Sequence, residues 1–383
     1  MRHDGIHGAA TYYSYELPSG CRRRVHCPAP ATARIRTFGD SFTHCDQVSD
    51  GETWQEVLSA HLNEGLENYG VGGYSVFQAY LRMQQVEREA AEPADYLILN
   101  IWDDDHLRNL DPWPALRRRT LCVQYTQPHL DVELTEGLRS TAATVTPRPN
   151  PLRSAAAVRG CLSDPAWLVE TLGDAPLVRM LVDCGLTELS AFRVRALLFA
   201  CYAQLTDDDS DDSDPSSQSS LKEIVAEIDA ATAGDDTVAQ GESAEEGAAW
   251  RRYVAAPPGG AEAVRAMAAH VAAALAGSRF VVEQAEEMAA RNGQKLMVLL
   301  SHSEQGIRRE LRGEPRWDAR FVRWLRGRPL PLVDLRDAHR EVRGQPRATG
   351  PAARATAGCR LMVCGAQDYA QLGCSEDAYL ARH

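Results

Sequence analysis

The sequence predicts an α/β protein: a three-layer α/β/α sandwich with a five-stranded, mainly parallel sheet and a long helical and disordered insertion. Three observations predict it. Strand-like and helical patterns alternate over residues 31–107, which is typical of a parallel sheet flanked by helices. The alternation resumes over residues 261–341, and residues 108–260 lack it. The chain has 383 residues, more than the ~100–200 of an ordinary domain, which leaves room for an insertion.

Hydrophobic periodicity justifies the elements of the first part, residues 31–107. Helices are expected where apolar side chains recur every three or four positions, and strands where short apolar runs end in glycine or polar residues. The third strand is almost wholly apolar, as in a parallel strand covered on both faces. The elements, in chain order, are a strand at 33–38, a helix at 53–61, a strand at 66–71, a helix at 76–89 and a strand at 95–102.

The remaining segments are assigned in the same way. Residues 1–30 form an irregular lead-in, and the insertion at 108–260 contains expected helices at 167–181 and 186–205. Residues 207–220 hold six Asp and six Ser, so an acidic, disordered linker is expected at about 207–247. The second part of the main domain, 261–341, has an expected helix at 261–291, a strand at 296–300, a helix at 316–326 and a strand at 330–335. An irregular tail occupies 342–383.

Composition excludes several classes of protein. The formal net charge is −12, but the acidic linker accounts for it, so nothing indicates binding to nucleic acid or to an anionic membrane. The longest apolar run, 268–277, is too short to span a membrane. None of the ten cysteines forms a CxxC pair, which argues against a zinc ribbon. We therefore expect a soluble, cytoplasmic protein with no cofactor and no metal centre.

The expected strands all end in polar residues. Because ligands of such sheets bind at the carboxyl ends of the strands, these ends are the candidate site. Ser41 follows the first strand, where backbone amides could stabilise the negative charge that develops when a nucleophile attacks. Asp40 and Ser41 could instead simply cap a helix. The motif is not a nucleophile elbow, because that motif needs a glycine both two residues before and two residues after the serine, and Thr43 stands two residues after Ser41.

The segment Gly39-Asp40-Ser41-Phe42-Thr43 resembles the first block of the GDSL, or SGNH, hydrolases, and Asn68-x-Gly70-x-x-Gly73 resembles their second block. The resemblance covers about residues 33–106 and 294–340. It implies a flavodoxin-like fold and a serine enzyme that hydrolyses esters or transfers acyl groups. Carried over to this chain, it implies Ser41 as nucleophile and Gly73 as an oxyanion donor. The expected substrate is a small-molecule ester or an acylated carbohydrate.

The third block departs from the family. Where members usually have Gly-x-Asn-Asp, this chain has Ile101-Trp102-Asp103-Asp104, followed by Asp105 and His106. Three interpretations stay open for Asp103, Asp104 and His106. A protonated Asp103 could donate to the oxyanion, the acidic cluster could hold a hard divalent cation, or these residues could serve structure and substrate positioning.

The general base is expected in the fifth block, after the last strand. His339, near Asp334 and Asp337, is the only histidine expected at the end of the fifth strand, yet the Asp that the family places three residues before its His is Arg336 here. Residues 342–367 contain no acid and show no periodicity. We hypothesise that they are a retained intron or a gene-prediction error and that the true catalytic His is missing; the alternative is a genuine disordered tail. Without a base this form would be inactive.

A rival interpretation is a non-catalytic module on the same fold that binds a carbohydrate or a cation at its polar rim. Other side chains near the motifs could shape a site. His302 and Glu304 could line its far wall, although loop residues of this kind are usually just solvated. Trp54, Trp102 and Tyr74 could form an acceptor pocket, although aromatic residues beside strand ends usually belong to the core.

Overall fold

The structure, a computed structural model, divides into two compact units. Unit 1 comprises Met1–Asn109 and Gly277–His383, and unit 2 comprises Leu110–Ala276. The structure describes residues 2–4, 10–28, 33–117, 126–135, 143–185, 187–198, 260–303, 306–307 and 316–337. The expected acidic linker, the tail from 342, His339 and Glu304 lie outside these residues.

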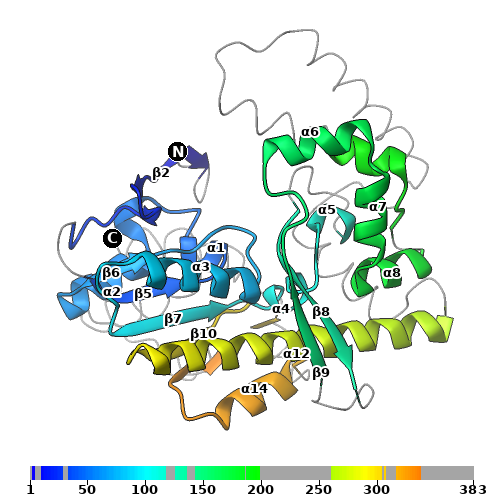
Figure 1. Ribbon diagram of the computed structural model, residues 1–383. Coiled ribbons are helices and arrows are strands. Elements are labelled where there is room, and N and C mark those ends of the chain that lie inside the picture. Colours follow the sequence, from blue (N-terminus) through cyan, green and yellow to red (C-terminus); the bar gives the residue numbers. More distant parts are fainter. Residues whose placement is uncertain are drawn as a thin grey trace, which may run out of the picture. The chain divides into compact units, whose positions relative to one another are not determined.

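Unit 1 contains a mostly parallel sheet (Figure 1). Its strand order is β11-β10-β7-β5-β6-β4-β3. Parallel pairing joins β6, β5, β7, β10 and β11, whereas β4 pairs antiparallel with β6 and β3 antiparallel with β4. The bounds are β3 Tyr15–Glu16, β4 Cys21–Arg22, β5 Ala33–Phe38, β6 Gly65–Asn68, β7 Tyr96–Ile101, β10 Lys295–Leu300 and β11 Leu332–Asp334. A separate two-stranded sheet pairs β1 (Arg2–Asp4) with β2 (Ala10–Tyr12).

The expectation of five strands was therefore incomplete. The five parallel strands are present, but the sheet has seven, because two short antiparallel strands extend its β6 edge. Both lie in the segment expected to be irregular. Strands of two residues give no periodic signal, and they are set here by pairing: Arg22 in β4 lies opposite Asn68 in β6.

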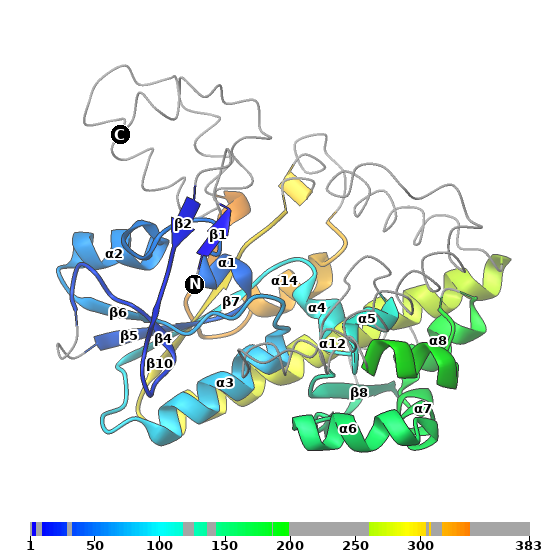
Figure 2. The same ribbon diagram turned by 90° about the horizontal axis from the view of Figure 1, so that it is seen from above.

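Helices cover both faces of the sheet. Helix α2 (Trp54–Leu62) covers one face through a buried cluster that includes Trp54, Ile98 and Leu299. Since side chains alternate along a strand, Leu97, Leu99 and Val298 point to the other face, and all three are buried. The helix α12 (Gly260–Arg291) passes from unit 2 into unit 1 at residue 277. Figure 2 shows its unit 1 part side by side with α3 (Val76–Glu89), on the side of the strands away from α2.

Hydrogen bonds link three helices in a row. The Tyr80 hydroxyl of α3 donates to the carbonyl of Gln284 in α12, and Arg279 of α12 donates to the carbonyl of Arg320 in α14 (Ala319–Arg326). This arrangement is compatible with the expected sandwich. The expected bounds match closely for β5, α3 and α12. The last helix begins three residues later than expected, after Arg316 and Asp318 have paired in the preceding turn.

Unit 2 is built around its own apolar core, which includes Trp113, Leu168, Leu172 and Val194. The helix expected at 167–181 is two helices, because Pro176 begins the second. A helical stretch at 191–198 falls within the range expected for the next helix. The hairpin was not expected. The elements are α5 Pro114–Arg117, the hairpin β8 His129–Leu134 and β9 Ala143–Arg148, α6 Ala155–Ser163, α7 Ala166–Gly173 and α8 Pro176–Asp183.

Within the described ranges, no helix is both long and apolar enough to cross a membrane.

Candidate functional site at the carboxyl ends of the strands

Ser41 begins the short helix α1 (Ser41–His44), directly after β5. Asp40 precedes it as the cap, and its Oδ1 accepts a hydrogen bond from the Phe42 amide at 2.9 Å. The capping role that the sequence suggested is therefore real, and Asp40 fills it. Ser41 itself is half-buried, and its hydroxyl makes no hydrogen bond with any described group. A side chain left without a structural partner is available for chemistry.

The glycine-rich loop after β6 runs alongside Ser41. The Val71 amide donates to the Gly39 carbonyl at 3.0 Å. A Cβ on Gly70 would lie 2.3 Å from the His44 nitrogen, so only glycine allows this approach. A Cβ on Gly72 would lie 3.9 Å from the Cβ of Ser41, which places this part of the loop against the serine.

Two backbone amides in this region are open. The amides of Ser41 and Gly73 donate no hydrogen bond to any group within the described ranges, and Gly73 has a positive φ of 82°. Both residues are half-buried, so each amide can donate to water or to a bound ligand, and an oxyanion is one ligand that such amides stabilise.

Arg108 connects the loop after β5 to the loop after β7. It donates to Asp104 at 2.9 Å and to Asp105 at 3.1 Å, and lies 3.8 Å from Asp40 Oδ2. Burial raises the pKa of Asp40 to about 6 against the opposing charge of Arg108. Burial, together with repulsion from Asp40, raises the pKa of Asp105 well above its usual value. Arg108 therefore holds three carboxyl groups in place, and Asp104 serves this structural network.

Asp103 points into a different network. Its carboxylate accepts from His302 Nδ1 at 2.8 Å, from the Ser303 amide and hydroxyl, and from Arg336 at 3.2 Å. Burial alone would raise the pKa of Asp103, but His302 and Arg336 hold it well below the usual range. An ionised, fully paired Asp103 supports the structural interpretation and leaves little basis for a protonated oxyanion donor.

His302 bridges two carboxylates. Its Nε2 lies 2.9 Å from Asp334 Oδ1, opposite the contact with Asp103. Burial would lower the pKa of His302, but Asp103 and Asp334 together raise it above its ordinary value. Arg316 completes the network with a 2.6 Å bond to Asp334. Because both nitrogens donate to carboxylates, neither can accept a proton from Ser41, so His302 does not act as the base.

His106 faces the core. Its Nδ1 lies 2.7 Å from the Ser278 hydroxyl, and its ring meets Phe321 edge-on at 4.7 Å. Burial lowers the pKa of His106 to about 4, so the ring is neutral near pH 7. Asp103, Asp104 and His106 thus have separate partners, and the described ranges contain no group of three or more ligands that could hold a metal ion.

Only part of the segment expected to supply the general base lies within the described residues. Asp334 belongs to the His302 network, and Asp337 pairs with Arg326 at 3.1 Å. His339, the expected base, lies outside the described residues. No described imidazole forms a hydrogen bond with Ser41.

Two of the three expected pocket aromatics, Trp54 and Trp102, pack against Phe42 of the α1 turn. Trp54 is buried and donates to the Phe42 carbonyl at 3.3 Å. Trp102 stacks on Phe42 with 5.1 Å between ring centroids. Tyr74 contributes its carbonyl to Arg108. These contacts fix the backbone that carries Ser41.

Sequence reasoning did not single out His44, Asp46 and Tyr15. His44 lies three residues after Ser41 and contacts both Asp46 Oδ1, through Nδ1, and the Tyr15 hydroxyl. A signal existed for His44, because residues three apart on a helix share a face. Tyr15 comes from β3, a strand that no periodicity revealed.

No protein-family model matches the chain, and no curated protein matches it.

Proposed function

We propose that this protein is an SGNH-like serine hydrolase with a flavodoxin-like α/β/α sandwich, acting on an ester or acyl group. Ser41 is the nucleophile in this proposal, and the amides of Ser41 and Gly73 receive the oxyanion. The observation that carries the proposal is the conjunction of the unpartnered Ser41 hydroxyl with those two unpaired amides. Both residues are half-buried, so a ligand can reach these groups.

The chemistry follows from this arrangement. Ser41 Oγ attacks the acyl carbon, the carbonyl oxygen becomes negative, and two amides fixed in advance stabilise that charge. Gly72, which carries no side chain, keeps the approach to Ser41 open. His339 is the proposed base, with Asp337 two residues before it. The proposed substrates are small-molecule esters or acylated carbohydrates, and we propose a cytoplasmic location without nucleic-acid partners.

A fluorophosphonate probe tests the nucleophile. Intact-mass measurement should show one phosphonate on the wild-type chain and none on Ser41→Ala. Ser303→Ala is the matched control, because that serine also follows a strand but its hydroxyl is bound to Asp103. Labelling that persists in Ser41→Ala, or that disappears only in Ser303→Ala, would refute the assignment.

The second candidate is a non-catalytic module on the same fold that binds a carbohydrate. The observation that favours it is that no described imidazole forms a hydrogen bond with Ser41. A cation is a poorer ligand for this rim, because Asp103, Asp104 and Asp105 are already bound to cationic side chains. A wild-type chain that binds a sugar but never labels with the probe would support the module.

A further inference from the structure

Tyr15, His44 and Asp46 form a continuous chain of hydrogen bonds next to the α1 turn. His44 Nδ1 contacts Asp46 Oδ1, and His44 Nε2 lies 2.8 Å from the Tyr15 hydroxyl. A carboxylate only accepts hydrogen bonds, so Nδ1 carries a proton and donates to Asp46. The Nε2 position then exchanges a proton with Tyr15: a neutral ring accepts it, and a charged ring donates it.

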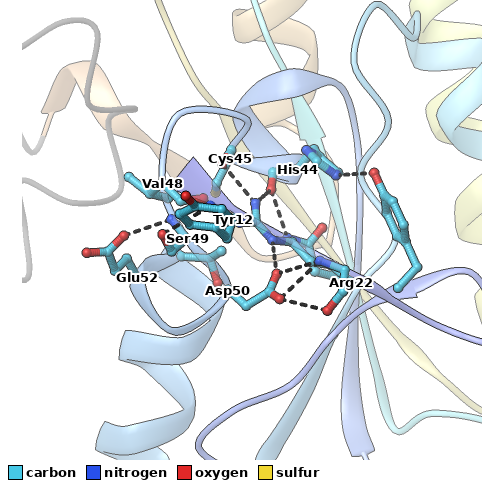
Figure 3. A network of polar contacts seen from close by, with 12 residues as sticks. Tyr12, Arg22, His44, Cys45, Val48, Ser49, Asp50 and Glu52 are labelled. Atoms are coloured by element: carbon cyan, nitrogen blue, oxygen red, sulfur yellow. Dashed lines mark hydrogen bonds and ion pairs between the residues drawn. The ribbon is translucent and has the colours of Figure 1, made fainter. Parts of the chain in front are cut away.

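The N-terminal strands hold His44 rigidly. Arg22 of β4 donates to the carbonyls of His44, Cys45 and Val48 and forms an ion pair with Asp50 at 3.0 Å (Figure 3). The ring of Tyr13 meets the imidazole edge-on at 5.0 Å. His44 is only 4% exposed, so its two hydrogen bonds are fixed in direction.

The outer end of this chain is accessible. Tyr15 is 41% exposed, although the ring to which its hydroxyl is bonded is buried. Burial raises the pKa of Tyr15, with Tyr13 and Asp46 adding to the shift, so the phenol keeps its proton near pH 7. Tyr15 can therefore pass a proton between His44 and a ligand at the surface.

Gly72 links this chain to Ser41. A Cβ at Gly72 would lie 3.2 Å from Asp46 Oδ2 and 3.9 Å from the Cβ of Ser41. The exposed glycine thus lies close to both the proposed nucleophile and Asp46. His44 also lies on the same helical face as Ser41, three residues along.

We propose that Tyr15, His44 and Asp46 form a proton relay for the alcohol half of the substrate at the Ser41 site, an inference that rests on the proposed function. Tyr15 is the residue that touches the substrate, and His44 and Asp46 position it and store the proton. The relay suits esters of aliphatic alcohols, including sugar hydroxyls, because such alkoxides need a proton in order to leave.

The proton balance closes over one turnover. During acylation, Ser41 Oγ bonds to the acyl carbon and gives its proton to the base. As the bond to the alcohol breaks, Tyr15 protonates the departing oxygen and takes a proton from His44. During deacylation, an attacking water loses its proton through Tyr15 to His44, while the base returns its proton to Ser41. The acyl group leaves as an acid, and every group regains its starting state.

The test compares Tyr15→Phe with Tyr12→Phe, a matched control because Tyr12 is 60% exposed in the same segment. The first measurement is the rate of labelling by a fluorophosphonate probe, which needs no protonated alcohol. The second is hydrolysis of p-nitrophenyl acetate. Its phenolate leaves without an acid, so with this substrate His44 releases its proton through Tyr15 to water before it accepts the proton of the attacking water. Both variants must unfold at the same temperature as the wild type.

Tyr15→Phe should label within about 2-fold of the wild-type rate. With p-nitrophenyl acetate it should release one rapid equivalent and then turn over about 100-fold more slowly, because deacylation has lost its base. Intact mass should show the accumulated acetyl enzyme, and Asp46→Asn should show the same pattern to a lesser degree. Tyr12→Phe should behave as the wild type.

Two results would overturn the relay while leaving the proposed function intact. Labelling and turnover of Tyr15→Phe could fall together, which indicates a structural role, or neither could change. Wild-type protein that never labels would instead refute the proposed function, and the relay with it.

Discussion

Two regions at the same edge of the sheet carry polar groups that differ in whether they have hydrogen-bond partners. At the ends of β5 and β6, the Ser41 hydroxyl and the amides of Ser41 and Gly73 have no partner within the described ranges. At the ends of β7, β10 and β11, each charge of Asp103, His302 and Asp334 is matched. We call these the open region and the closed region. Pairing therefore separates polar residues that serve structure, such as Asp103 and His302, from a residue that is open to a ligand, such as Ser41.

The closed region should give the largest effect on stability. His302→Ala leaves Asp103 and Asp334 without the cation that bridges them, and breaking a buried pair in this way typically costs about 3–5 kcal/mol. Urea unfolding measures the loss. The control is His26→Ala, whose side chain is exposed and should change stability by less than about 0.5 kcal/mol. A loss below about 1 kcal/mol would mean that the region is not closed.

Two glycines of one loop sharpen the comparison. Gly70→Ala forces a Cβ to 2.3 Å from the His44 nitrogen and should destabilise the protein by about 3 kcal/mol or more. Gly72→Ala meets only ordinary or slightly tight contacts and should cost less than about 0.5 kcal/mol. Thermal unfolding of both variants provides the measurement. Equal losses would show that the loop does not lie against α1 as described.

Asp40 stands between the two regions and gives stability a pH dependence. Its pKa is raised from 3.8 to about 6, so between these values the folded chain holds a proton that the unfolded chain has lost. Stability from this group is greatest below pH 4 and falls as the pH rises to about 6, by up to about 3 kcal/mol.

Asp40→Asn should lack this fall, because an amide does not ionise. Unfolding free energies of the two proteins at pH 4, 5, 6 and 7 should therefore diverge in favour of the variant as the pH rises. A difference that stays constant across the series would contradict the raised pKa.

Two serines should give the smallest effects and the most direct contrast. Ser278 is fully buried and bonds both His106 and Asn109, so Ser278→Ala should cost about 1–3 kcal/mol. Ser41→Ala removes a hydroxyl without a partner and should leave stability within about 0.5 kcal/mol. Chemical denaturation checks both. A costly Ser41→Ala would mean that its hydroxyl has a structural role.

The sequence predicted the parallel strands well because their apolar runs are determined locally. The strands β3 and β4 escaped prediction, since two residues carry no period and their pairing depends on β6. The same limit applied to the site. Ser41 and Gly73 could be identified as motif positions. The sequence could not show that the neighbouring residues Asp103 and Asp104 belong to different networks, because their partners His302 and Arg108 reach them only in the folded chain.

His44 shows what sequence reasoning misses even when the spacing of a residue is plain. Its spacing from Ser41 was visible, but its partners Tyr15 and Asp46 acquire meaning only when the edge strands fold over the α1 turn.

A crystal structure of the chain after reaction with a fluorophosphonate tests the central claim most directly. The account predicts continuous density from Ser41 Oγ to phosphorus, with the phosphoryl oxygen accepting hydrogen bonds from the amides of Ser41 and Gly73. Phosphorus bound to another serine, or an adduct on Ser41 whose oxygen points away from both amides, would contradict it.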